Sequence, residues 1–249
     1  MSAPRVMIWA QHLLGIGHLK RAAALARGFA EAGLETILVS GGMPVPGLAP
    51  GGARLVQLPP LKTVDDGRWA LLDRGGAAVD EAWLARRRDR LLDIFRAIRP
   101  AALVLEMYPF GRRKFAFELE PLLDAAMAAR SRPLVLCSVR DVLQIDSKPA
   151  RAQSVAASIM HRFDHVLVHG DPAVLPFAAS FAAAARIAER LTYTGFVHAS
   201  LDSSFVPGAA RARRGVVVSA GGGAVGTALL QTALAARPLS ALPTRPGSF

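Results

Sequence analysis

Short apolar runs alternate along this chain with longer segments whose apolar positions recur at helical spacing. The runs are bounded by Gly, Pro or polar residues, as buried parallel strands are. We expect strands at 5–9, 35–40, 54–58, 102–107, 134–139, 165–169 and 191–197. We expect helices from Leu19 to just before Gly33 and at about 77–98, 115–129, 150–161 and 178–188. The alternation predicts an α/β fold with a doubly wound parallel sheet.

The first expected strand leads through a glycine loop into the first helix. Gly15 and Gly17 lie in this loop, and His18 follows at the start of the helix. Glycines let a ligand approach the backbone closely, and the free amides of a helix start favour an anionic group. Because ligands of open α/β sheets bind at the carboxyl ends of strands, this loop is the first candidate site.

A second strand, glycine loop and helix begin near residue 215. Valines precede Gly221, Gly222 and Gly223, and a helix is expected at 227–236. One strand and one helix cannot bury a core of their own. We therefore expect an N-terminal α/β domain at 1–197, a linker at 198–214, and the incomplete start of a second α/β domain at 215–249.

The cysteine content and the hydropathy pattern indicate the cellular compartment of the protein. The single cysteine, Cys137, lies in the apolar run 133–138, which predicts a buried residue and a reducing, cytoplasmic environment. No apolar run approaches the ~20 residues of a membrane span, and the amino terminus lacks the pattern of a signal peptide. We expect a cytoplasmic protein.

The net charge of +11 arises from 30 Lys and Arg against 19 Asp and Glu. Such a field attracts phosphates or anionic lipid headgroups, so peripheral contact with the inner face of a membrane stays open. A solvated arginine-rich surface explains groups such as 86–88 and 211–214 equally well. We expect no nucleic acid as a partner, because no zinc-ligand spacing, aromatic RNP motif or helix-turn-helix signature accompanies the charge.

Charged residues follow two other expected strands. They are Glu106, Arg112, Arg113 and Lys114 around the end of the 102–107 strand, and Arg140 and Asp141 after the 134–139 strand. Arginine binds phosphate through two parallel hydrogen bonds, so these cations are candidate phosphate contacts. The alternatives are that Glu106 pairs with Arg112 or Arg113, that 112–114 is a solvated helix start, and that Arg140 pairs with Asp141.

The order of these motifs resembles bacterial GT-B glycosyltransferases. The motifs are Gly15-Ile-Gly-His18, the Thr-Gly-Phe-Val run at 194–197, and the restart Val-Ser-Ala-Gly-Gly-Gly at 218–223. Within GT-B, the chain is similar to family-28-type enzymes, relatives of the N-acetylglucosaminyltransferase that completes the lipid-linked peptidoglycan precursor. Gly15-x-Gly17-His18-x-x-Arg21, together with the run 106–115, resembles a group of predicted bacterial glycosyltransferases. The resemblance covers about residues 5–236.

The resemblance implies two Rossmann-like domains that face each other across a cleft. The N-terminal domain would take a hydroxyl or lipid-linked acceptor, and the C-terminal domain a nucleotide-sugar such as a UDP-sugar. It implies a hexosyltransferase that uses no cofactor and no metal. Because the chain ends where the donor domain begins, we expect this truncated chain to be inactive alone, and a separate donor-domain chain is a candidate partner.

Sugar transfer needs a base for the acceptor hydroxyl and a dipolar or positive partner for the leaving diphosphate. We expect His18 to be the base, as the histidine of the family's glycine loop implies; the alternative is a helix-capping histidine. Glu106 is the other candidate, as a base or as the group that orients His18. Gly15, Gly17 and the cations at 112–114 and 140 are assigned, with Asp141, to the acceptor side, and Gly221–Gly223 to the donor diphosphate. We interpret His12, His161, His165 and His169 as structural.

Two rival hypotheses remain. The chain could be a non-catalytic acceptor-binding half that works only with a separate donor-domain chain. It could also be an NAD- or nucleotide-binding Rossmann protein. The second rival is weaker, because Gly15-x-Gly17-x-x-Lys20 lacks the third small residue of that fingerprint and the 35–40 strand ends in Ser40 instead of an acid.

Overall fold

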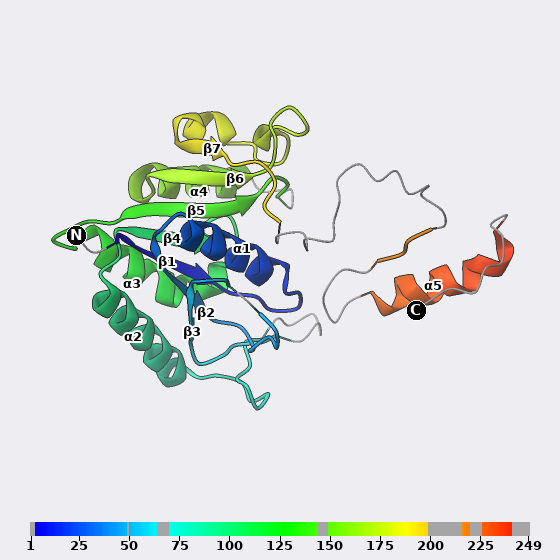
Figure 1. The fold of residues 1–249 in the computed structure, drawn as a ribbon, viewed down its shortest axis with the longest axis horizontal. Coiled ribbons are helices and arrows are strands. Elements are labelled where there is room, and N and C mark those ends of the chain that lie inside the picture. Colours follow the sequence, from blue (N-terminus) through cyan, green and yellow to red (C-terminus); the bar gives the residue numbers. More distant parts are fainter. Residues whose placement is uncertain are drawn as a thin grey trace.

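The computed structural model describes residues 3–48, 50–63, 70–143, 149–198, 216–219 and 226–240. Its centre is a seven-stranded sheet in which every pair of neighbours runs parallel (Figure 1). The strands are β1 Arg5–Ala10, β2 Glu35–Ser40, β3 Arg54–Gln57, β4 Ala102–Glu106, β5 Leu134–Arg140, β6 His165–His169 and β7 Leu191–Tyr193. The α-helices are α1 Gly17–Glu31, α2 Glu81–Ile98, α3 Ala116–Met127, α4 Pro149–Arg162 and α5 Thr227–Ala236.

The strand order is β3-β2-β1-β4-β5-β6-β7. The chain builds outward from β1 in one direction, then returns and builds outward from β4 in the other. The topological switch point therefore lies between β1 and β4, where open α/β sheets bind their ligands. This order confirms the predicted Rossmann-like α/β class.

Helices cover both faces of the sheet, because side chains of a strand point alternately to opposite faces. The α1 residues Leu19, Ala22 and Ala26 share one buried cluster with Val6 and Ile8 of β1. On the other face, the intervening β1 residues belong to a cluster with α2, α3 and α4. The members of that cluster include Met7, Trp9, Leu91, Leu119 and Ile159.

The helix ends follow local chemistry. Gly33, just past α1, has a φ of +83°, which is the left-handed cap expected there. The α2 helix begins at Glu81, later than the expected start near residue 77. The reason is Asp80, whose carboxylate accepts the Trp83 backbone N–H at 2.7 Å and caps the helix.

The expected helix at 178–188 is absent from the described structure. The segment forms two 3₁₀ helices instead, η2 Phe177–Ala179 and η3 Ala184–Arg190. Phe177 and Phe181 pack edge-on against Phe110, with ring centroids 5.4 and 5.0 Å apart. We infer that this aromatic packing overrides the helix propensity of the alanines. The last strand also ends early, at Tyr193, shortly before the left-handed Gly195.

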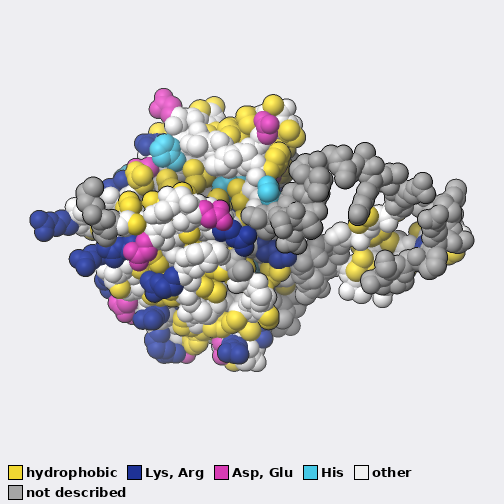
Figure 2. All heavy atoms as spheres, viewed as in Figure 1, with side chains coloured by type: hydrophobic (Ala, Val, Ile, Leu, Met, Phe, Trp, Pro, Cys, Tyr) yellow, Lys and Arg dark blue, Asp and Glu magenta, His cyan; other side chains and the backbone are white. Residues whose placement is uncertain are grey.

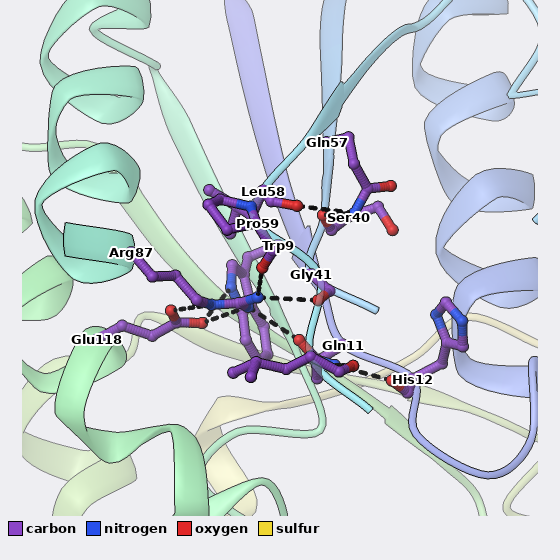
Figure 3. A network of polar contacts seen from close by, with 11 residues as sticks. Trp9, Gln11, His12, Ser40, Gly41, Gln57, Leu58, Pro59, Arg87 and Glu118 are labelled. Carbon is purple, nitrogen blue, oxygen red and sulfur yellow. Dashed lines mark hydrogen bonds and ion pairs between the residues drawn. The ribbon is translucent and has the colours of Figure 1, made fainter. Parts of the chain in front are cut away.

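Arg87 fits neither alternative for 86–88, a solvated surface or a charged patch, because its side chain is fully buried. It forms an ion pair with Glu118 of α3, with Nε 2.7 Å from Oε2. Its other nitrogens donate to the carbonyls of Gly41 and Pro59 and to Oε1 of Gln11 (Figure 3). A buried guanidinium is tolerated because its donors are satisfied.

Other positive side chains are scattered over the visible face of the molecule among acidic and apolar ones (Figure 2). Arg211, Arg213 and Arg214 lie outside the described residues. Cys137 is fully buried, as predicted. Among the described helices, none is long and apolar enough to cross a membrane.

The chain beyond residue 198 is described only in part. The expected helix at 227–236 is confirmed as α5, which has no buried residue. Residues 216–219 are described without strand structure, and Val216, Val217 and Val218 are exposed. Gly221, Gly222 and Gly223 lie outside the described residues. The division into domains at 197 and 215 stays a prediction.

Candidate functional site

His18 and Glu106 meet at the switch point between β1 and β4. His18 lies in the first turn of α1, so the loop after β1 delivers it to the carboxyl edge of the sheet, and Glu106 is the last residue of β4. The Nδ1 atom of His18 lies 3.0 Å from Oε1 of Glu106. Arg21, one helical turn after His18, forms an ion pair with the same oxygen.

Glu106 is a buried carboxylate surrounded by donors. Its side chain is 0% exposed, whereas that of His18 is 28% exposed. Burial alone would raise the pKa of the Glu106 carboxyl. The hydrogen bond with His18, the charge of Arg21 and a hydrogen bond from Ser138 outweigh burial and lower that pKa below its usual value.

The pKa of His18 is also lowered. Burial is the largest cause and outweighs the hydrogen bond to Glu106, and the positive charge of Arg112 lowers the pKa further. A neutral imidazole beside an ionised carboxylate is therefore the state near pH 7. In that state His18 can accept a proton from a ligand.

Polar side chains continue from Glu106 across the carboxyl ends of the neighbouring strands. Ser138 of β5 is the register partner of Glu106, and its hydroxyl donates to Oε2 of Glu106 at 2.5 Å. Oγ of Ser138 lies 2.9 Å from Nε2 of His169, the last residue of β6. Nδ1 of His169 lies 2.7 Å from the hydroxyl of Thr194, just after β7. We call Glu106, Ser138, His169 and Thr194 the polar row.

A pocket of about 710 Å³ opens beside His18. The loop after β4, the end of β5, the start of α4 and the segment 178–182 form its walls. Apolar residues and arginines share the lining, among them Met107, Phe110, Arg112, Arg140, Leu143, Arg151, Val155 and Phe181. No Asp or Glu occurs among the described lining residues. The lining therefore suits a ligand that joins an anionic group to an apolar part.

The cations predicted after β4 divide into two groups. Arg112 lines the pocket, and its Nε atom is buried without a hydrogen-bond partner among the described residues. Arg113 and Lys114 begin the 3₁₀ helix η1 (Arg113–Phe115), are exposed and do not line the pocket. The alternative pairing of Glu106 with Arg112 or Arg113 is wrong in the described structure, where Arg21 is the ion-pair partner.

The remaining acceptor-side candidates lie at the same edge of the sheet. Arg140 lines the pocket. The carboxylate of Asp141 accepts the Val142 backbone N–H at 2.9 Å, and the described residues contain no ion pair between Asp141 and Arg140. Gly17 begins α1, and a Cβ atom there would have no neighbour within 4 Å among the described residues. Gly15 is half-buried in the preceding loop.

Sequence reasoning did not single out several residues of the site. Arg21 follows His18 by three residues, the spacing that places both on one helix face, so the signal was present in the motif. Ser138 and His169 interrupt apolar strands near their carboxyl ends, which is a weaker signal. His169 was interpreted as structural, and the structure places it in the polar row.

No protein-family model and no curated protein sequence matches the chain. Several solved structures that match it are glycosyltransferases, the class that the sequence resembles. SsfS6 glycosyltransferase of Streptomyces sp. SF2575 is 14% identical, with TM-score 0.41, over 70% of this chain and 52% of that chain. MurG of Acinetobacter baumannii is 12% identical, with TM-score 0.39, over 68% and 42%.

A structure from another class of enzyme matches to a similar degree. UDP-N-acetylglucosamine 2-epimerase from Rickettsia bellii is 11% identical, with TM-score 0.44, over 78% of this chain and 45% of that chain. This chain spans about half the length of these three structures. Their likeness to it concerns the type of fold and does not extend to activity or substrate.

Proposed function

We propose that this chain carries the acceptor half of a GT-B glycosyltransferase, which moves a sugar from a nucleotide-sugar, such as a UDP-sugar, to a hydroxyl group. One observation carries the proposal. A neutral, partly exposed His18 is held by the buried carboxylate of Glu106 at the switch point of the sheet, beside a pocket. An imidazole in this state is suited to accept the proton of an acceptor hydroxyl.

In the proposed reaction, Nε2 of His18 accepts the hydroxyl proton while the acceptor oxygen bonds to the anomeric carbon of the sugar. The bond between that carbon and the diphosphate oxygen breaks, and the nucleoside diphosphate leaves with its electron pair. Glu106 stabilises the imidazolium that forms, and Arg21 keeps Glu106 ionised. We assign the donor diphosphate to the backbone amides of Gly221–Gly223.

The proposed acceptor has an anionic group and an apolar part. Arg112 and Arg140 would bind the anionic group, because guanidinium matches phosphate and carboxylate oxygens through paired hydrogen bonds. Phe110 and Phe181 would pack against the apolar part. A lipid-linked phosphate and a small amphipathic acid share this chemistry.

The acceptor proposal is tested by calorimetric titration of the 249-residue chain. The probes are octyl phosphate, octyl glucoside with the same tail, and inorganic phosphate with the same charge. We expect octyl phosphate to bind most tightly, and Arg112→Gln and Arg140→Gln each to weaken it about tenfold, since a charged hydrogen bond contributes about 1.5–3 kcal/mol.

Arg113→Gln is the matched control, because Arg113 neighbours Arg112 but does not line the pocket. Equal losses in Arg113→Gln and Arg112→Gln would indicate attraction by general surface charge and contradict the pocket. Equally tight binding of octyl glucoside would contradict the anionic group. Binding of phosphatidylglycerol vesicles without binding of soluble octyl phosphate would assign the charge to a membrane surface instead.

Transfer is tested by nucleoside diphosphate release from a panel of nucleotide-sugars with hydroxyl acceptors. The chain is assayed alone and with a donor domain, encoded downstream or as a separate polypeptide. We expect turnover only with the donor domain, since the helices described beyond residue 198 bury no side chain. His18→Ala should reduce that turnover about 10²–10⁴-fold.

His161→Ala, an exposed histidine of α4, serves as the control and should leave turnover unchanged. Full turnover in His18→Ala removes His18 from the mechanism. Binding of the acceptor probe without turnover under any condition would favour the non-catalytic acceptor-binding half.

A further inference from the structure

Two buried residues behind His18 have no part in the reaction described above. Ser138 is 0% exposed and His169 is 4% exposed, and neither lines the pocket. They are nevertheless joined to His18 through Glu106. We propose that Ser138 and His169 are positioning residues that select the tautomer of His18 and leave its Nε2 atom as the proton acceptor.

The contact between Ser138 and Glu106 sets the direction of the first hydrogen bond. The two oxygens are 2.5 Å apart, a separation at which two lone pairs would repel each other. An ionised carboxylate can only accept, so the single hydroxyl proton of Ser138 lies between these atoms. The length is typical of a charge-assisted O–H···O⁻ bond.

This direction decides the tautomer of His169. Since the Ser138 proton is committed to Glu106, Oγ of Ser138 is left to accept from Nε2–H of His169, 2.9 Å away. Nδ1 of His169 then carries a lone pair and accepts from the Thr194 hydroxyl at 2.7 Å. Burial and the charge of Arg21 lower the pKa of His169 to about 4, so the ring is neutral and holds one tautomer near pH 7.

At the other end of the polar row, Glu106 has one oxygen left for His18. Ser138 occupies Oε2, which turns Oε1 toward His18 and Arg21. A contact of 3.0 Å between Oε1 and Nδ1 of His18 requires the proton on Nδ1. The Nε2 atom of His18 is therefore the atom that remains to accept a proton.

The other charged or titratable groups near His18 come from three elements. They are Arg21 of α1, Arg112 of the loop after β4 and His12 of the loop after β1. Nη2 of Arg21 also lies 3.4 Å from Nδ1 of His18, farther than the 3.0 Å between that nitrogen and Oε1 of Glu106. An arginine only donates, so it would favour a lone pair on Nδ1, and the shorter contact with the carboxylate is the one that favours a proton there. The selection therefore depends on the orientation of the carboxylate, which Ser138 and His169 hold.

The role of Ser138 and His169 in proton transfer rests on the proposed function. The test of that role does not, because it measures the tautomer of His18 directly. The full chain, labelled with ¹⁵N and ¹³C at histidine, is studied by NMR, in which the ring ¹⁵N shifts report tautomer and protonation for each of its 6 histidines. We expect His18 as the Nδ1–H tautomer and His169 as the Nε2–H tautomer in the unaltered chain. The signal of His18 is assigned with His18→Gln.

Ser138→Ala and His169→Leu should each convert His18 from one dominant tautomer to a mixture of both. Ser138→Ala should also raise the pKa of His18, because a carboxylate that loses a donor stabilises the imidazolium more strongly. His169→Gln keeps an N–H donor for Ser138 and should restore the tautomer of His18. Restoration by this conservative change is not expected of a residue that only fills space.

Ser40→Ala is the matched control. Ser40 ends β2, is buried, and its hydroxyl has no hydrogen-bond partner among the described residues. The Ser40→Ala variant should leave the tautomer and the pKa of His18 unchanged. The proposal is overturned if the tautomer of His18 is unaltered in both Ser138→Ala and His169→Leu while circular dichroism shows that these chains are folded. It is also overturned if Ser40→Ala changes the tautomer of His18 to the same extent. If the tautomers are as expected but no glycosyl transfer is detected, the proposed function is wrong and the positioning role of Ser138 and His169 stands.

Discussion

At the residue scale, the site is organised by one buried negative charge among several positive ones. Glu106 has no exposed surface and is ion-paired with Arg21. Burial is the largest cause of the lowered pKa of His18; the charges of Arg112 and Arg21 lower it further, and the hydrogen bond to Glu106 raises it. The balance keeps the imidazole neutral and still able to become charged when it receives a proton, the requirement for a general base.

His169 makes stability depend on pH. Its pKa is about 4 in the folded chain against 6.5 for an ordinary histidine, so between these values the unfolded chain binds the extra proton. This contribution is present in full above pH 6.5 and is lost as the pH falls toward 4. We expect the contribution of His169 to the free energy of unfolding to decrease by about 2 kcal/mol between pH 6.5 and 5.

The measurement is urea unfolding of the unaltered chain and of His169→Gln at both pH values. The variant should lose about 2 kcal/mol less stability on acidification. His12 and His18, whose pKa values are also lowered by burial, leave part of the acid sensitivity in the variant. Equal losses in both chains would show that His169 titrates normally in the folded state.

At the element scale, local signals and tertiary packing compete. The start of α2 follows a local signal, because Asp80 supplies the capping oxygen. The segment 177–190 follows packing instead. Phe177 and Phe181 are buried against Phe110, and the segment forms the two 3₁₀ helices η2 and η3 in place of one α-helix. The same segment forms one wall of the pocket, so its departure from an α-helix shapes the site.

Asp80→Ala should destabilise the protein by about 1 kcal/mol, because it removes the acceptor for the Trp83 N–H. Chemical denaturation measures the change. Asp93→Ala in the same helix is the comparison, since Asp93 pairs with Arg96 on an exposed surface and should cost less than about 0.5 kcal/mol. Similar losses for both would mean that Asp80 acts through charge and not as a cap.

At the scale of the whole molecule, Arg87 joins elements that are distant in the sequence. From α2 it reaches Glu118 of α3, Gln11 after β1, Gly41 after β2 and Pro59 after β3 (Figure 3). Gln11 in turn donates to the carbonyl of His12 at 2.8 Å, at the start of the loop that leads to His18. We infer that this network holds the glycine loop against the sheet.

The network leaves no space for larger residues at the end of β2. A Cβ atom on Gly41 would lie 2.4 Å from Nη2 of Arg87, and one on Gly42 would lie 2.4 Å from the ring of His12. The pair of glycines after β2 is therefore needed for close approach between elements and not for a special backbone angle.

Arg87→Met should destabilise the protein by about 3–5 kcal/mol, because it leaves the carboxylate of Glu118 buried without its partner. The double variant Arg87→Met with Glu118→Gln removes that charge, keeps an acceptor for Trp9 and should recover part of the loss. Arg88→Met, at an exposed ion pair, is the control. Urea unfolding measures the loss of stability in the single and double variants. If the double variant recovers none of the stability lost in Arg87→Met, the unpaired charge of Glu118 is not the cause of that loss.

The sequence by itself determined the class of fold and the edge of the sheet where the site lies. Contiguous apolar runs mark buried parallel strands, and the residues at their carboxyl ends must meet at one edge, so His18 and Glu106 could be placed together. Only the tertiary structure decided that Arg87 is buried, that Arg21 pairs with Glu106, and that Ser138 and His169 extend the site. The residues in contact are far apart in the sequence: 31 positions for Arg87–Glu118, 31 for Ser138–His169, 32 for Glu106–Ser138 and 85 for Arg21–Glu106. Such pairings depend on strand order and register, which local patterns do not encode.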